Sequence, residues 1–405
     1  MPQLMNIEQA STLLNAVVEQ ATGQQSLATI SNVSDFVSVA QVLLQMGVDP
    51  VMNAISQVWR RTVFAVREYD NPLSTLRMTE SAWGNATRKL SPIADEMVDD
   101  AAFDYPATYD AGQTPPTGDG LSIDPWTIHK QKQLQTNFYG SSVYMQHFSV
   151  FRNQLMVSFE SPEQWLQFNQ MCITERRNDR ESFEEGKARL LQANLIAAIL
   201  DENASDRVIH ALTEYNTVTG ITPALTAQTV MQAGNFEAFI RWLYARIRTV
   251  VGLMGARSEM FQTKIGTAKI LRHSRPENLR VALYRPFMEM IRSMVLSNLF
   301  NADMMNLPTY EAIDYWQAID TPDSIDLYAE YTDTAGAAKT SSSAVQQGDI
   351  IGIIHDRDAI GYAMLDAVSA VTPMNPKGLY WNEYYHARCA TLMDNTEKAV
   401  VILLD

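Results

Sequence analysis

Histidines, cysteines and paired carboxylates are the residues whose types and spacing could give this sequence a metal site or a catalytic site. The six histidines among the 405 residues are His129, His147, His210, His273, His355 and His386. None belongs to an H-E-x-x-H or similar pattern, in which one helical turn aims two imidazoles at a single metal ion. We therefore expect no metal site, and we expect His355 to make local hydrogen bonds before a hairpin turn.

Cysteines and carboxylates give no stronger indication of catalysis. Cys172 and Cys389 are too few for a disulfide framework, so we expect two core thiols in a reducing compartment. The pairs Asp99–Asp100 and Glu184–Glu185 show no apolar setting of the kind that tunes a catalytic carboxylate, and they are expected on solvated surfaces. The sequence contains no G-x-S-x-G, Walker or G-x-G-x-x-G motif that opens a strand-to-helix turn. It therefore predicts neither an enzyme nor a bound cofactor.

The net charge of −15 argues against a protein whose main task is gripping nucleic acid, because phosphate binding needs clustered lysine and arginine. Two arginine-containing stretches, 175–181 and 245–257, are expected to be salt-bridged helix exteriors. No window reaches the ~18 apolar residues that a membrane span requires, and the N-terminus has no basic region followed by an apolar run. We expect a cytosolic protein that is made without signal-dependent secretion and does not enter a membrane.

A long helix is the clearest single element in the sequence. Ser161 is a good N-cap, Pro162 suits the first helical position, and Gln164 completes a capping box. Helical spacing continues to about residue 202, and ~40 residues at 1.5 Å each give a rod of roughly 60 Å. A helix of this length is expected to act as a strut.

The remaining pattern is mixed. Helices are expected over 7–66, ending at Asn71–Pro72, then from Asn235 and again after Pro286. Strands are expected over 143–151, 155–159 and 281–284, as two strands joined by a tight turn within 348–371, and as two closing strands that a loop near Asn395 separates. The polar stretch 321–347 is expected to be a loop. The fold class is α+β, with helices packed on an antiparallel sheet.

An acidic, proline-rich segment spans residues 91–125, with eight acidic residues, five prolines and no lysine or arginine. Such a composition cannot bury enough surface to fold alone. A disordered surface loop is one interpretation, and a long loop ordered by another subunit is the one we favour. The residues assigned to this inter-subunit contact are Asp99, Asp100, Tyr105, Pro106, Pro115, Pro116, Pro125 and Trp126.

The closing segment 375–405 is rich in aromatic residues and begins with a turn. Proline presets φ and glycine tolerates the exit geometry of such a turn. Strand alternation is expected to place Leu379 and Trp381 on one face, which Tyr385 could share, and Tyr380 and Tyr384 on the other. The residues expected to form this motif and to join the last strands to the core are Asn375, Pro376, Gly378, Leu379, Tyr380, Trp381, Tyr384, Tyr385 and His386.

This run closely resembles the end of the core domain in major capsid proteins of small short-tailed tailed bacteriophages, the picovirus-like group with protein-primed genomes. A weaker resemblance covers 58–78, around an Asn-Pro-Leu element. The resemblance implies a Hong Kong 97-type capsid fold: an N-terminal arm with lead-in helices over 1–75, an extended loop over 76–140, and a peripheral domain with the spine helix over 141–204. It also implies an axial domain over 205–375 and C-terminal strands over 376–405 that return to the core sheet.

The function implied by the resemblance is a structural protein that self-assembles, as pentamers and hexamers, into the icosahedral head shell around a double-stranded DNA genome. Its partners would be copies of itself, scaffolding and portal proteins during assembly, and DNA held without specificity. The arginines of 175–181 and 245–257 could then face that DNA. The protein would be made in the host bacterial cytoplasm and reside in the virion. An encapsulin-like nanocompartment shell and a soluble α+β enzyme are the alternatives.

Overall fold

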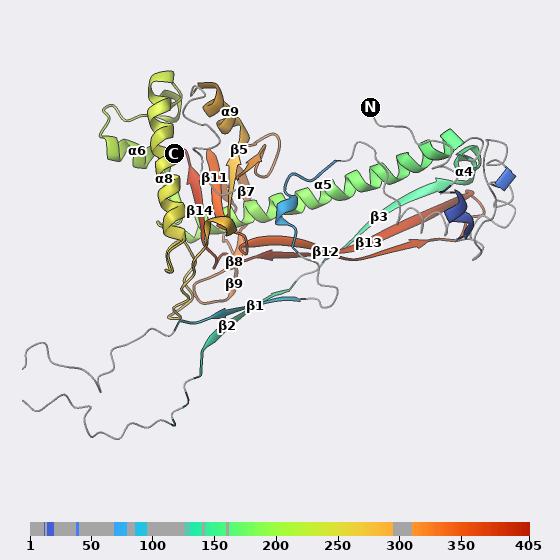
Figure 1. Cartoon of the computed structure of the whole chain (residues 1–405), viewed down its shortest axis with the longest axis horizontal. Helices are drawn as coiled ribbons and strands as arrows, with labels where there is room; N and C mark the ends of the chain where they lie inside the picture. The colour runs from blue at the N-terminus through green and yellow to red at the C-terminus, as the bar shows by residue number, and fades with distance from the viewer. Residues whose placement is uncertain are drawn as a thin grey trace, which may run out of the picture.

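The computed structural model describes residues 12, 14–19, 38–39, 69–78, 86–94, 126, 128, 130–139, 142–158, 162–294 and 310–405. Its main feature is an elongated body in which one long helix, α5 (Pro162–Glu202), runs along most of the length (Figure 1). Of the helix expected over 7–66, residues 12, 14–19 and 38–39 are helical, and the rest lies outside the described residues.

Helix α5 confirms the predicted rod, since it extends over 41 residues without a break. The middle of the helix and its C-terminal segment differ in polarity. The middle of the helix carries charged residues, whereas the segment 193–199 is almost entirely apolar and largely buried. The helix therefore anchors its C-terminal end in a hydrophobic core and presents charges further along.

A three-stranded antiparallel sheet runs alongside α5 in the order β12 (Ile360–Val371), β13 (Tyr380–Met393), β3 (Ser142–Phe151) (Figure 1). Strand β13 is the central strand and pairs over ten residues with β3. Its pairing with β12 is interrupted by a bulge between Leu365 and Ala367. The sheet and the helix together form the long arm of the molecule.

The second sheet has five strands in the order β4 (Val208–His210), β14 (Ala399–Leu403), β11 (Ile350–Asp356), β5 (Leu279–Tyr284), β6 (Tyr310–Ile313). Every residue of β11 and β14 is buried, as expected for central strands covered on both faces. The outer pairs β14–β4 and β5–β6 are parallel, so this sheet is mixed, not purely antiparallel.

Helices cover one face of this sheet and the end of α5 covers the other. The covering helices are α6 (Ala211–Thr219), α7 (Ala227–Val230), α8 (Ala233–Met254) and α9 (Arg285–Met294). Apolar residues of α8 and α9 pack with alternate residues of β5, β11 and β14 in one core. The intervening residues of these strands pack with α5 in a second core. The predicted helices after Asn235 and Pro286 and the strand 281–284 are confirmed.

Three two-stranded antiparallel sheets complete the described fold. Strand β1 (Ala86–Pro92) pairs with β2 (Gln133–Tyr139), and this hairpin projects from the body (Figure 1). The other pairs are β7 (Ile325–Leu327) with β10 (Val345–Gln347) and β8 (Glu330–Thr332) with β9 (Ala338–Thr340). The expectation of a loop over 321–347 is therefore wrong: small polar residues there still pair backbone groups, and Tyr331 and Ile325 enter the core.

Two further strand expectations are corrected. The segment expected to be a strand over 155–159 belongs, up to Ser158, to helix α4 (Arg152–Ser158). Strand β3 stops at Phe151, opposite Tyr380 where β13 begins, so the next residues have no strand of that sheet to pair with. Strands β11 and β12 are joined by a turn at 357–359 but form no hairpin, because β5 and β14 already occupy both edges of β11.

Candidate functional site

The turn that precedes β13 is built on Asn375. Its side-chain Oδ1 accepts hydrogen bonds from the backbone N–H groups of Lys377 (3.0 Å) and Gly378 (3.1 Å). Leu379 adopts a left-handed φ of 49° and donates its N–H to the carbonyl of Asn375 at 2.8 Å. A Cβ at Gly378 would lie 2.4 Å from the ring of Tyr380, so only glycine allows this close approach.

The aromatic residues of β13 divide between two faces of the sheet. Trp381 points to the α5 side and is almost completely buried, opposite Val150 of β3. Tyr380 lies on the other side, with its ring centroid 5.7 Å from that of Phe151. Leu379 does not share the face of Trp381 as expected, because it belongs to the left-handed turn and is 41% exposed. Pro376 lies in the same turn, and its preset φ suits that position.

Tyr384 and His386 of the motif lie on the outer face of the sheet, away from α5. The ring of Tyr384 lies between His147 on β3, 6.2 Å away, and His386, 6.4 Å away. Tyr385 points inward, where its hydroxyl accepts a hydrogen bond from Arg180 of α5 at 3.3 Å. The motif therefore joins the sheet to the helix on one side and leaves an aromatic and imidazole row on the other.

Several charged side chains in the middle of α5 face the sheet, whereas Glu175 and Asp179 are exposed. Arg176 forms an ion pair with Glu383 of β13 at 2.9 Å. Glu184 is wholly buried between Arg180, at 3.0 Å, and Arg77. The expectation that Glu184–Glu185 is a solvated pair is wrong, since guanidinium groups from both the helix and another segment supply the missing compensation.

Residues 69–78 form a short strap across α5 and β12. The hydroxyl of Tyr69 bonds to Glu185, and this hydrogen bond, with burial, raises the pKa of Tyr69 to about 12. The amide of Asn71 donates to the hydroxyl of Tyr362 at 2.8 Å, while the N–H of Met78 donates to the Tyr362 carbonyl at 2.7 Å. Burial, followed by the charge of Glu184, raises the pKa of Tyr362 to about 12. The Asn-Pro-Leu element thus holds the helix to the sheet.

A polar turn at 394–398, between β13 and β14, joins the two halves of the molecule. All five of its residues are buried. Asn395 bonds to the backbone of Thr332 and to the hydroxyl of Thr263. Thr263 in turn bonds to Glu202 at the end of α5, at 2.7 Å.

Two cations from outside the turn reach its carboxylates. Lys89 of β1 forms an ion pair with Asp394 at 2.7 Å and a second with Glu397, which also pairs with Arg272. Burial alone would raise the pKa of Asp394, but Lys89 and the other partners outweigh it and lower that pKa. For Glu397 burial prevails and raises the pKa.

Buried bases also lie at this junction. Lys398 donates to the carbonyls of Met254 (3.1 Å) and Ala256 (2.7 Å), and burial lowers its pKa to about 8. His355 Nδ1 bonds to the carbonyl of Asp356 at 2.8 Å, the local contact that was expected, and burial lowers the pKa of His355 to about 4. These two groups belong to the same polar junction, since the Asp356 N–H donates to the Lys398 carbonyl.

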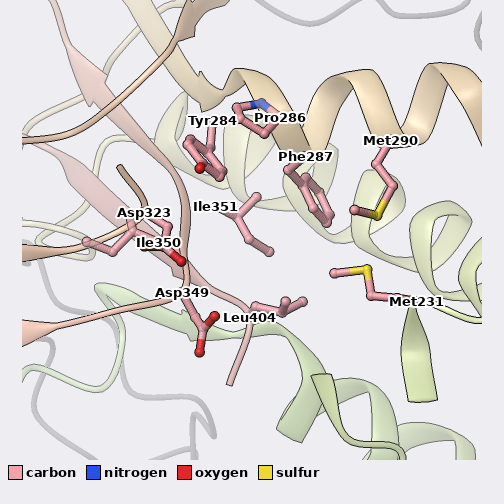
Figure 2. Close-up of a pocket in the computed structure, with 10 residues that line it drawn as sticks. All are labelled: Met231, Tyr284, Pro286, Phe287, Met290, Asp323, Asp349, Ile350, Ile351 and Leu404. Carbon is pink, nitrogen blue, oxygen red and sulfur yellow. The ribbon is translucent and has the colours of Figure 1, made fainter. Parts of the chain in front are cut away.

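Two cavities open on the described surface. One, of about 150 Å³, lies between α9 and the end of the five-stranded sheet, and its lining includes Phe287, Met290, Met231 and Ile351 (Figure 2). The other, of about 360 Å³, lies between the middle of α5 and the turn after β7 and includes Lys187 and Cys389. Among the described residues no group of three metal-ligating side chains occurs, and no helix there is long and apolar enough to cross a membrane.

The residues predicted to cap α5 and those predicted to form the inter-subunit loop fall only partly within the described residues. Pro162 begins α5 and Gln164 lies in its first turn, whereas Ser161 lies outside the described residues. Trp126 is 85% exposed. The other assigned loop residues lie outside the described residues: Asp99, Asp100, Tyr105, Pro106, Pro115, Pro116 and Pro125. The loop near Asn395 was predicted, but the burial of all five residues 394–398 was missed, because a polar D-N-T-E-K run is typical of an exposed turn.

Solved structures from several phages contain chains that are similar to this one. A chain from the capsid structure of Staphylococcus phage Andhra is 10% identical over 85% of this chain and 87% of its own, with a TM-score of 0.54. A chain from the structure of the head fiber and inner core protein gp22 of native bacteriophage P68 is 9% identical over 85% and 87%, with a TM-score of 0.49. One from the capsid of cyanophage P-SCSP1u is 10% identical over 84% and 90%, with a TM-score of 0.42. The first of these likenesses defines the class of fold as that of a phage capsid protein.

The family model described as Phi29-like phage major capsid protein matches residues 14–403, which is nearly the whole chain. The chain therefore belongs to that family and is a structural protein of the phage capsid shell. A comparison with curated protein sequences finds no match.

Proposed function

We propose that this chain has the Hong Kong 97-type capsid fold and closes, as pentamers and hexamers, into an icosahedral head around double-stranded DNA. The observation that carries the proposal is the combination of a family match over residues 14–403 with a subunit built around a continuous 41-residue helix. A rod of this length spans about twice the diameter of a small domain, which suits a wall element more than a compact catalyst.

The predicted domain boundaries fit this proposal except at β12 (Ile360–Val371), which lies in the range given to the axial domain but pairs with β13 in the three-stranded sheet. Helix α5 and the three-stranded sheet would form the peripheral domain over 141–204 together with the returning strands of 376–405. The five-stranded sheet and its helices would form the axial domain over 205–375, completed by β14. The β1–β2 hairpin would be the base of the extended loop over 76–140, and the strap at 69–78 would end the arm over 1–75.

We further propose that the protein has no enzymatic activity and needs no cofactor. Scaffolding and portal proteins would act during assembly in the host bacterial cytoplasm, and the finished shell would be the head of the virion. The genome would be contacted without sequence specificity, because the net charge of −15 opposes tight binding of phosphates. A shell wall that attracts DNA weakly would let the packaged genome leave again.

Sedimentation of the purified chain, together with the nucleic-acid content of particles from infected or expressing cells, tests the function. We expect particles of hundreds of copies that enclose double-stranded DNA when packaging components are present. Particles filled with a cargo enzyme would favour the nanocompartment alternative, which the family match does not favour. A chain that remains a monomer or dimer at all concentrations would contradict the proposal.

A further inference from the structure

The β1–β2 hairpin meets the body of the protein through the second half of β1, at a cluster of four charged side chains. This charge cluster consists of Lys89, Arg272, Asp394 and Glu397. Strands β1 and β2 pair with each other and with no other strand of the described chain. The direction in which the hairpin projects (Figure 1) therefore depends on the few contacts that residues 89–94 make with the body.

Those contacts come from two directions. Lys89 reaches the turn 394–398, where it bonds to Asp394 at 2.7 Å and to Glu397. Arg272, from the loop after α8, bonds to Glu397 and to the hydroxyl of Ser91 on β1 at 3.2 Å. One backbone hydrogen bond, from Ala94 N–H to the Lys269 carbonyl at 2.9 Å, accompanies them.

The burial of the partners makes this contact specific. Asp394 and Glu397 are 1% and 6% exposed, so neither can exchange Lys89 for water without losing a compensating charge. The cluster has two positive and two negative groups and is balanced only while Lys89 is seated. Asp394 is also fixed by Thr396, whose N–H and hydroxyl both donate to its Oδ1, at 2.9 and 2.5 Å. The carboxylate of Asp394 is therefore held in place, and Lys89 is the partner that can move away from it.

We propose that the charge cluster is a latch that fixes the direction of the β1–β2 hairpin in the free subunit, before copies associate. The inference rests on the proposed function, in which this hairpin carries the loop that meets a neighbouring copy. If the hairpin already points in one direction in the free subunit, association costs less conformational entropy. If the hairpin is free to move, that entropy is lost each time two copies associate. The latch positions the hairpin, and its contribution to the free energy of association recurs in every subunit of the shell.

Lys89→Met tests the latch, because it keeps the aliphatic stem and removes the charge. In hydrogen exchange on the unassembled subunit, we expect amides of 86–94 to exchange about tenfold faster or more, as a loss of 1.4 kcal/mol would produce. The concentration at which shells first form should rise by about tenfold by the same relation. Lys89→Arg should remain within about twofold of the parent chain in both measurements, since it restores the charge.

Lys132→Met is the matched control. Lys132 stands beside the same hairpin and is exposed, and its backbone carbonyl, not its side chain, bonds to Ile93. We expect parent-like exchange and parent-like assembly. Thermal unfolding confirms that each variant folds, and Ser91→Ala, which removes only the hydroxyl that Arg272 contacts, provides a milder loosening if Lys89→Met does not fold.

Unchanged exchange in the Lys89→Met variant would overturn the latch. Faster exchange with an unchanged assembly threshold would overturn its positioning role. If the parent chain forms no shells at all, the proposed function fails, while the exchange measurement on the subunit still decides whether the latch exists.

Discussion

Trp381 of β13 lies directly opposite Val150 of β3, and both side chains are almost wholly buried. This pair stands one residue after the turn that Asn375 organises, at the point where the long sheet begins. The relationship explains why the closing segment concentrates aromatic residues in one window. The strand that returns from the far end of the molecule must be fixed to its neighbour at its first residues for the remaining pairs to form in register.

We expect Trp381→Ala to lower the free energy of unfolding of the subunit by about 3 kcal/mol or more, the usual cost of removing a buried indole and leaving a cavity. Chemical denaturation of unassembled subunits measures it. Tyr384→Ala, on the same strand but on the open face, is the control and should cost about 1 kcal/mol or less. Equal effects of the two substitutions would show that Trp381 is not the anchor.

The buried carboxylate of Glu184 makes Arg77 a second anchor. We expect Arg77→Met to lower the free energy of unfolding by about 2 kcal/mol, less than for a fully buried pair because Arg77 is 38% exposed on its side chain. In a Glu184→Gln background the same substitution should cost less than half as much. A double-mutant cycle with a coupling energy near zero would contradict this role for the strap.

Acid should destabilise the subunit through His355. Its pKa is about 4 in the folded chain, and burial is the main cause, with Arg280 nearby and the carbonyl of Asp356 acting in the opposite sense. The unfolded chain takes up the proton near pH 6.5, so stability is lost as the pH falls from 6.5 to about 4, by about 3 kcal/mol in all. His355→Gln should remove this part of the pH dependence of the unfolding free energy. If the unfolding free energies of the parent chain and of His355→Gln changed with pH in parallel, His355 would not be the cause.

Gly352 allows the close approach of β5 and β11. A Cβ at this position would lie 2.6 Å from the carbonyl oxygen of Ala282, so we expect Gly352→Ala to shift the strand and cost about 1–3 kcal/mol, as overpacking does. Gly348→Ala is the matched control, because a Cβ there meets nothing within 4 Å. Thermal unfolding of both variants should separate them clearly. A stable Gly352→Ala protein would mean that the two strands can move apart at little cost.

The long helix and the closing strands could be predicted because their signals are local. The Ser-Pro-x-Gln start and the apolar period of α5, and the turn before Tyr380, depend on neighbouring residues alone. The predictions that were wrong concern residues whose environment is set by partners distant in the chain. Glu184 resembles a solvated residue until Arg77 is brought to it, and residues 155–158 resemble a strand until the sheet offers no neighbour there. The polar segment 321–347 gains its strands from backbone pairing that its side chains do not indicate.

The central claim is that the subunit is completed by copies of itself, and a cryo-electron microscopy map of assembled particles tests it most directly. We predict a closed shell of pentamers and hexamers in which the segment 95–125 of each subunit lies on a neighbouring copy. A map, or a solution structure of the isolated chain, in which that segment folds back onto its own body and no shell forms would contradict the account.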